Sequence, residues 1–104
     1  MTGVARTAES LPADFFLAQN YPNPFNPSTT IEYDLPKASH IQLTIYDMLG
    51  RHIKQLVNAQ RPAGRYSISW DGTEESGRPV AAGLYFCRME ADGYSDVVKM
   101  ALVR

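Results

Sequence analysis

The chain lacks a second cysteine: Cys87 is its single thiol, which excludes an internal disulfide. It also lacks long apolar runs, and no segment approaches the roughly 20 residues needed to cross a bilayer, so no transmembrane segment is predicted. The first residues, MTGVARTAES, lack the apolar centre of a secretory signal peptide. If the parent protein is exported, we expect its signal to lie outside this chain.

An excess of positive charge is missing as well. Ten Lys and Arg residues stand against eleven Asp and Glu residues, which gives a net charge of −1. The basic residues are scattered from Arg6 to Arg104, so no stripe of them could neutralise a row of phosphates. Nucleic acid is therefore not predicted as a partner.

Groups suited to catalysis are few. A nucleophilic site needs a base within hydrogen-bond reach of the nucleophile and a third group that orients the base. Only His40 and His52 are available as imidazoles, each expected at a strand edge beside a turn, and Cys87 lies in an apolar strand. No Gly-rich nucleophile elbow or paired-acid cleft is evident. We predict that the chain is not an enzyme and needs no cofactor, and that Cys87 is a small core residue.

What is present fits one compact domain. The chain has 104 residues, of which 44% are hydrophobic, and a chain of this length buries about 65% of its unfolded surface. Residues 1–14 are small and polar without periodicity, so we interpret them as a linker remnant, with a first methionine that cloning could have added. Residues 15–104 form the predicted domain.

Apolar residues alternate with polar ones instead of following a helical stripe. TTIEYDLP and HIQLTIYDM show the period of two that is typical of half-buried strands. HIKQLV, PAGRYSISW, LYFCRMEA and YSDVVKMALVR continue the series. Short strands at this spacing predict an all-β fold, an immunoglobulin-like antiparallel β-sandwich of about seven strands.

Turn residues separate these strands. In DMLGR, an aspartate begins the turn and Gly50 stands where a positive φ is needed, which predicts a hairpin. Ile53 and Leu56 break the alternation of the next strand, so we expect a bulge or a twist there. Trp70 shares a face with Tyr66 and Ile68 and is predicted to lie in the core. The residues expected to shape the fold are Gly50, Gly64, Gly83 and Trp70.

A proline segment, NYPNPFNP, precedes the first clear strand. Its prolines remove backbone donors and hold φ near −65°, which favours an extended or turning path. Its asparagines can bond to nearby backbone groups in Asx-type turns, and Tyr21 and Phe25 can anchor it to the sandwich edge. Two interpretations stand side by side, a rigid lid over one end of the core and an epitope that a translocon recognises. The candidate residues are Asn20, Pro22, Asn23, Pro24, Phe25, Asn26 and Pro27.

The loop DGTEESG gathers three carboxylates, Asp71, Glu74 and Glu75, which in principle could hold calcium. The calcium-loop template of helix–loop–helix proteins fails here, because Gly77 falls one place late and Ala82 stands where the last acid belongs. We therefore predict a solvated loop without a metal, in which Asp71 accepts hydrogen bonds from the backbone beyond Gly72.

Paired neighbours raise a carbohydrate-binding hypothesis. Ile45 and Tyr46 are adjacent in one strand, as are Tyr85 and Phe86 in another, so the members of each pair point to opposite faces. An aromatic ring left on the outer face could stack on sugar rings, as in a carbohydrate-binding module of a secreted hydrolase. In the alternative interpretation, loops or the leading residues cover these rings.

The sequence contains the stretches LAQNYPNPFNPSTTIEYDLP, IYDMLGR, AGRYSISWDG and SGRPVAAGLYFCRMEA, and its last residue is basic. Together these features resemble the C-terminal sorting domains of the type IX secretion system. The pattern is also similar to the immunoglobulin-like domain of the flagellar hook-cap protein. The resemblance covers about residues 15–104. Cys87 departs from it, since the family more often has an aromatic residue there.

The resemblance implies a non-catalytic C-terminal domain of a secreted multidomain protein. Such a domain directs type IX secretion and holds its cargo at the cell surface, so the implied partners are the outer-membrane secretion machinery and N-terminal cargo domains of the parent chain. A monomer is expected. A hook-cap-like assembly domain remains an alternative. By family likeness, the sorting strand consists of Lys99, Met100, Ala101, Leu102, Val103 and Arg104.

Overall fold

A computed structural model of the protein describes residues 11–104, and within this range all regular secondary structure is β-strand. No helix in the described range is long and apolar enough to cross a membrane. The strands are β1 (Phe16–Leu17), β2 (Thr29–Leu35), β3 (Ser39–Asp47), β4 (His52–Arg61), β5 (Gly64–Trp70), β6 (Gly83–Ala91) and β7 (Tyr94–Leu102).

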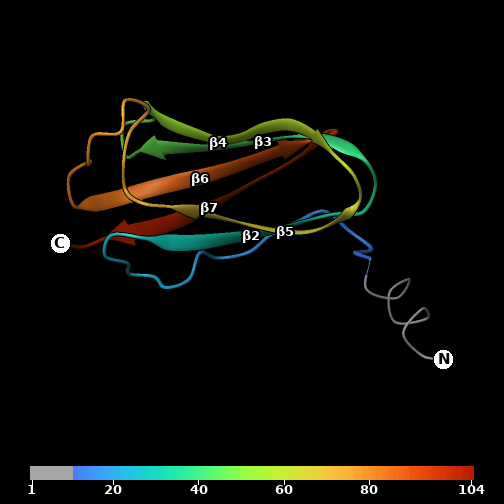
Figure 1. Ribbon diagram of the computed structural model, residues 1–104, viewed down its shortest axis with the longest axis horizontal. Coiled ribbons are helices and arrows are strands. Elements are labelled where there is room, and N and C mark those ends of the chain that lie inside the picture. The colour runs from blue at the N-terminus through green and yellow to red at the C-terminus, as the bar shows by residue number, and fades with distance from the viewer. Residues whose placement is uncertain (1–10) are drawn as a thin grey trace.

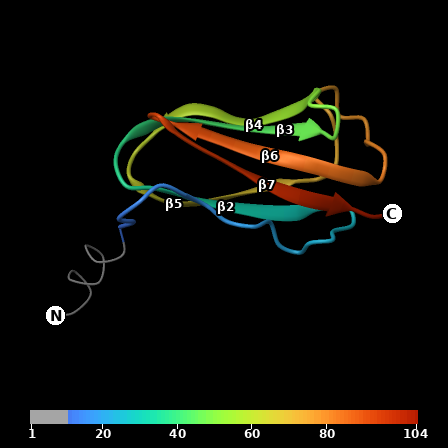
Figure 2. The same ribbon diagram turned by 180° about the vertical axis from the view of Figure 1, so that it is seen from behind.

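The strands form two layers. One sheet has three strands in the order β1-β2-β5, and the other has four in the order β4-β3-β6-β7. Within each sheet, neighbouring strands pair in antiparallel fashion. Figures 1 and 2, which view the molecule from opposite sides, show the two sheets packed face to face. The predicted immunoglobulin-like sandwich is therefore confirmed. β7 lies at one edge of the larger sheet, beside β6 alone.

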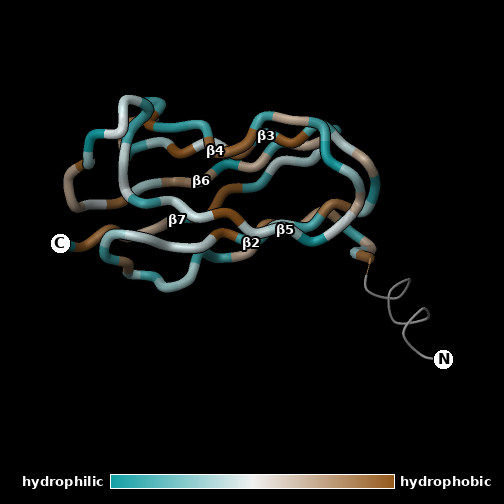
Figure 3. The backbone as a smooth tube through the Cα atoms, viewed as in Figure 1, coloured by the Kyte–Doolittle hydropathy of each residue, from teal (hydrophilic) through white to brown (hydrophobic). Residues whose placement is uncertain are grey.

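The core lies between the sheets because every second side chain of a strand points inward. Along the backbone tube in Figure 3, hydrophobic and hydrophilic residues alternate over short stretches. Trp70 is fully buried and contacts two other rings, Phe25 at 5.6 Å and Tyr85 at 5.3 Å between centroids. Its predicted place in the core is confirmed, and it connects both sheets with the proline segment.

The predicted hairpin joins β3 to β4. Asp47 Oδ1 accepts hydrogen bonds from the backbone N–H groups of Leu49 and Arg51, each at 2.9 Å, and Gly50 has φ +80°. The expected irregularity is also present, because the pairing of β3 with β4 shifts register after Leu43 and again after Ile45. These shifts explain why the burial of β4 does not alternate.

Residues 1–10 of the predicted linker lie outside the described residues. Of its last four residues, Pro12 is buried and Leu11, Ala13 and Asp14 are exposed. The boundary at residue 14 remains a prediction.

Candidate functional site

The proline segment is organised around Asn20, which is only 2% exposed. Its Nδ2 group donates to the Thr29 hydroxyl at 2.9 Å and to the Pro22 carbonyl at 3.2 Å. The Thr29 hydroxyl in turn donates to the same carbonyl at 2.8 Å. An amide side chain thus satisfies a backbone group that the prolines leave without a strand partner, as we expected for Asn20.

Of the two expected anchors, the structure supports one. Phe25 is 1% exposed and packs on Trp70, so its predicted role as an anchor fits its position. Tyr21 is 80% exposed, and the expectation that it anchors the segment is wrong. The reason is that Tyr21 is held by its backbone, which exchanges two 2.9 Å hydrogen bonds with Thr30, while its ring stays outside the core.

The proline segment runs along the outer edge of β7, and we call this contact the seam. Ala101 N–H donates to Asn23 Oδ1, Phe25 N–H donates to the Ala101 carbonyl, and Val103 N–H donates to the Phe25 carbonyl, each at 2.9 Å. Gln19 Nε2 extends the seam by donating to the Lys99 carbonyl at 2.7 Å. Figures 1 and 2 both show the end of β7 beside the segment that leads into β2.

Asn23 therefore does not act locally, although we expected all three asparagines to bond to nearby backbone groups. Its side chain instead reaches a strand 78 positions further along the chain. Sequence reasoning also missed Gln19 and Thr29. A threonine at the start of an alternating strand offered a weak signal for a buried polar group, and Gln19 offered none.

The predicted sorting strand has two faces. Met100 is fully buried and Leu102 is 2% exposed, so both belong to the core. Lys99, Val103 and Arg104 are exposed. The Arg104 guanidinium donates to the Val80 carbonyl from Nε at 3.1 Å and from Nη2 at 2.8 Å. The chain end is therefore bound to the sandwich and is also accessible to solvent.

The three carboxylates of the acidic loop have different partners. Asp71 accepts a hydrogen bond from the Thr73 hydroxyl, which is the largest cause of its lowered pKa. Glu74 accepts a short hydrogen bond from the Ser76 hydroxyl, and this bond is the main reason that its pKa is lowered. Glu75 accepts from the backbone N–H of Gln55 at 2.9 Å. Within residues 11–104, no three His, Cys, Asp or Glu side chains form a group suited to a metal ion.

Cys87 is fully buried, and burial raises the pKa of its thiol to about 12. A thiol that stays protonated is a poor nucleophile. The histidines make their contacts elsewhere: the His40 ring pairs with Asn58 Oδ1 at 2.6 Å, and His52 lies 3.7 Å from a Glu75 carboxylate oxygen. The position of Cys87 matches the predicted core role.

The two outward aromatics of the carbohydrate hypothesis lie together. Ile45 and Tyr85 are buried, whereas Tyr46 and Phe86 are half-buried and directly opposite each other on β3 and β6. Together with Val97, they line a hollow of about 350 Å³ on the outer face of the larger sheet. Carbohydrate binding there stays a prediction.

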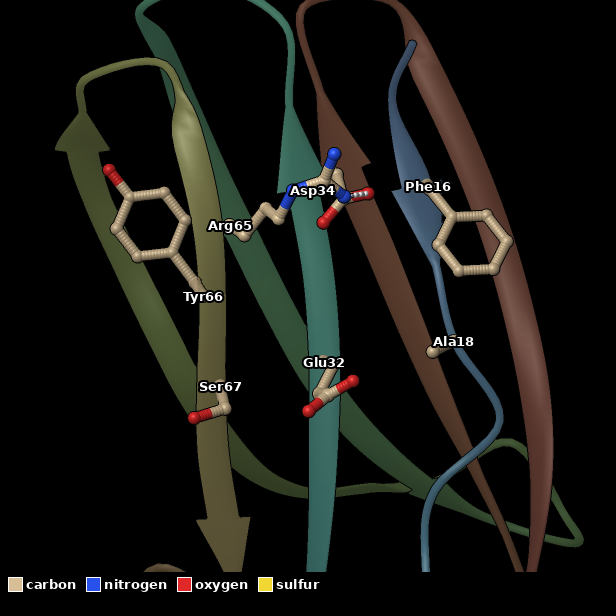
Figure 4. A pocket seen from close by; sticks show the side chains of 7 residues that line it. All are labelled: Phe16, Ala18, Glu32, Asp34, Arg65, Tyr66 and Ser67. Carbon is tan, nitrogen blue, oxygen red and sulfur yellow. Dashed lines mark hydrogen bonds and ion pairs between the residues drawn. The ribbon is translucent and has the colours of Figure 1, made fainter. Parts of the chain in front are cut away.

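A second hollow, of about 320 Å³, lies on the outer face of the smaller sheet. Figure 4 shows Glu32 and Asp34 of β2 between Arg65 of β5 and Phe16 of β1, with the Asp34–Arg65 ion pair at 3.2 Å. Its residues carry no distinctive sequence signal, because outward polar positions on a strand are usually only a solvated face. The ion pair neutralises one of its two carboxylates.

Known structures share this architecture. Dimeric latent PorU from Porphyromonas gingivalis matches 88% of the chain with a TM-score of 0.68 and 24% identity, and PorZ of the type IX secretion system of the same bacterium matches 99% with a TM-score of 0.59 and 22% identity. The chain covers only 10% of that PorU chain and 13% of that PorZ chain. At these identities the two likenesses show the fold alone.

FlgD proteins are similar to the same degree in sequence. FlgD from Xanthomonas campestris, described in connection with hook capping in flagellar assembly, matches 94% of the chain with a TM-score of 0.58 and 25% identity. FlgD from P. aeruginosa matches 72% with a TM-score of 0.53 and 26% identity. The chain covers 72% and 59% of these two proteins. No curated protein matches the chain.

Residues 26–95 match the family described as the FlgD Ig-like domain. This range is more than half of the chain and includes β2 to β6, the hairpin turn and Trp70. The chain belongs to the FlgD Ig-like domain family.

Proposed function

We propose that this chain is a non-catalytic C-terminal domain of a secreted multidomain protein, which directs type IX secretion and attachment to the cell surface. The observation that carries the proposal is the seam. It joins the proline segment to the strand that family likeness identifies as the sorting strand, and most of both segments lies outside residues 26–95, which the FlgD Ig-like family accounts for.

The proposed partners follow from the geometry of the chain end. Lys99, Val103 and Arg104 are exposed at an edge strand, so secretion machinery in the outer membrane could contact them while the sandwich remains folded. Cargo domains would precede the proline segment in the parent chain. The likeness to folds in PorU and PorZ agrees with this setting.

The test is a fusion of the chain to the C-terminus of a reporter in a host with type IX secretion. Deleting Lys99–Arg104 is a poor variant, because it removes the buried Met100 and Leu102 and would confuse loss of signal with loss of fold. The better variant is Lys99→Glu with Val103→Asp, which changes exposed side chains only.

We expect the wild-type fusion to reach the medium or the cell surface and the double-variant fusion to stay inside the cell. Circular dichroism should show that the wild-type and the double-variant domain are both folded. Gln60→Glu on the opposite edge strand, β4, is the matched control and should be exported. Retention of a folded wild-type fusion in the periplasm would disprove the proposal.

A hook-cap-like assembly domain is the second candidate, and membership of the FlgD Ig-like family favours it. This candidate predicts self-association or binding to a structural protein. Sedimentation velocity of the isolated domain over a range of concentrations distinguishes the two. A strict monomer without a filament partner would exclude the assembly role and agrees with the sorting role.

A further inference from the structure

The seam uses the edge groups of β7 that strand addition would need. In an antiparallel ladder, the residues that bond to the neighbouring strand alternate with residues whose N–H and C=O groups face the other way. At the end of β7 the outward groups are those of Ala101 and Val103, and the proline segment already bonds to them. A partner strand cannot add there while the seam is closed.

The terminal strand also cannot leave alone without exposing the core. Met100 and Leu102 would lose their burial, and Phe25 would lose the strand that covers it. Asn23 and Phe25 would be left with a free acceptor and a free donor. The closed seam is therefore the form that a partner meets on the folded domain.

On the closed seam, exposed residues of both segments are neighbours. The parallel bridge pairs Phe25 with Leu102, and Pro24 and Asn26 flank Phe25 as Ala101 and Val103 flank Leu102. Asn26, Pro24 and Val103 are all exposed, Val103 to 46%. Lys99 is exposed as well, and within residues 11–104 its ammonium group makes no ion pair.

Building on the proposed sorting function, we propose that the secretion machinery reads the terminal strand in place, as one half of a composite surface whose other half is the proline segment. The surface presents proline rings, the Val103 side chain and the positive charge of Lys99. Such a surface fits a protein groove lined by aromatic residues, which bind proline rings, with a carboxylate placed for Lys99. The proline segment is then part of the signal and not only a lid.

The first experiment compares one exposed change on each side of the seam. In the reporter fusion, Lys99→Glu changes the strand side and Asn26→Glu changes the proline side, while Gln60→Glu serves as the control. A composite surface predicts at least a tenfold loss of export for each of the first two variants and none for the control, with thermal melting confirming that all are folded. Export of folded Asn26→Glu at the wild-type level would overturn the proposal.

The second experiment locks the seam. Asn26→Cys with Val103→Cys places one thiol on each segment, at the position that follows the bridged residue, and Cys87 is too buried to compete for pairing. The reference is the Asn26→Ser, Val103→Ser pair, and disulfide formation is verified by a gel shift on reduction. Reading in place predicts that the locked fusion is exported as well as the serine pair.

Export that is lost on locking and restored by a reductant would mean that the strand is peeled away before it is read, which overturns the proposal. If the serine pair itself is not exported, the single-site variants of the first experiment decide. Failure of the wild-type fusion would refute the sorting function itself, so the two proposals fail in different ways.

Discussion

Asn20 shows how a single side chain organises the proline segment. It is nearly inaccessible to solvent, and its amide bridges the start of β2 and the carbonyl of Pro22. Its Oδ1 atom also accepts a hydrogen bond from Gln19 Nε2 at 2.7 Å, and the same Gln19 amide group bonds to the Lys99 carbonyl. The network thus connects the segment to the terminal strand.

Replacing Asn20 should be costly. Asn20→Ala removes the donor to the buried Thr29 hydroxyl and one of two donors to the Pro22 carbonyl, so we expect a loss of about 1–3 kcal/mol in the free energy of unfolding. Urea denaturation followed by Trp70 fluorescence measures this loss. Asn26→Ala changes an exposed asparagine of the same segment and should alter stability by less than about 0.5 kcal/mol. Equal effects of both variants would contradict the role of the Asn20 network.

Among the elements, the hairpin between β3 and β4 depends on local backbone chemistry. Asp47 accepts two backbone hydrogen bonds, and the bond from Arg51 N–H is the largest cause of its lowered pKa. Gly50 N–H donates to the Asp47 carbonyl at 3.0 Å, and its φ of +80° lies in the left-handed region. Both features were predicted from DMLGR, because a tight turn depends on neighbours in sequence.

Gly50→Ala tests the backbone requirement of this turn. Apart from Gly50 and its two chain neighbours, no residue has an atom within 4 Å of the position that a Cβ would take, so the change adds backbone strain and no clash. We expect a loss of about 1–2 kcal/mol in the free energy of unfolding. Gly50→Asn should lose less, because asparagine tolerates this conformation better. Chemical denaturation measures both, and an Asn variant that is less stable than the Ala variant would contradict this explanation.

The sheets themselves were predictable as far as their strands are local. Alternation together with turn residues identified six strands and the inward face of β5, with Tyr66, Ile68 and Trp70 on one side. β1, at two residues, is too short for a period of two to show. The order of the strands was not predictable, because pairing partners such as β3 and β6 are separated by intervening segments.

The molecule as a whole keeps several weak acids protonated inside or beside its core. Burial is the largest cause of the raised pKa values of Cys87, Tyr33, Tyr85 and Tyr94. An acid with a higher pKa in the folded state holds its proton more tightly when folded. Its stabilising effect is complete below the unfolded pKa and is lost as the pH rises through the folded pKa.

We therefore expect the free energy of unfolding to fall at alkaline pH, beginning near the ordinary thiol pKa of 9.0 and continuing toward about 12. One retained proton contributes a slope of about 1.4 kcal/mol per pH unit. Urea denaturation at intervals between about pH 8 and pH 11 measures the slope for the wild type and for Cys87→Ala. The variant should show a shallower slope because it lacks the thiol, and some slope should remain because the tyrosines are still present. Identical slopes would show that the thiol does not contribute.

For the candidate site, as for the fold, the sequence predicts the features that depend on neighbouring residues and not those that depend on distant ones. Composition and spacing sufficed for the strands, the hairpin, the inward Trp70 and the opposite faces taken by Tyr85 and Phe86, because each depends on residues that are close in sequence. The burial of Phe25, the exposure of Tyr21 and the seam depend on which segments meet in space. Gln19 and Lys99, which are bonded across the seam, stand 80 positions apart, and nothing in the alternation of either segment encodes that contact. Periodicity is a local property of a chain, whereas the partner of an edge strand is chosen by the packing of the whole sandwich.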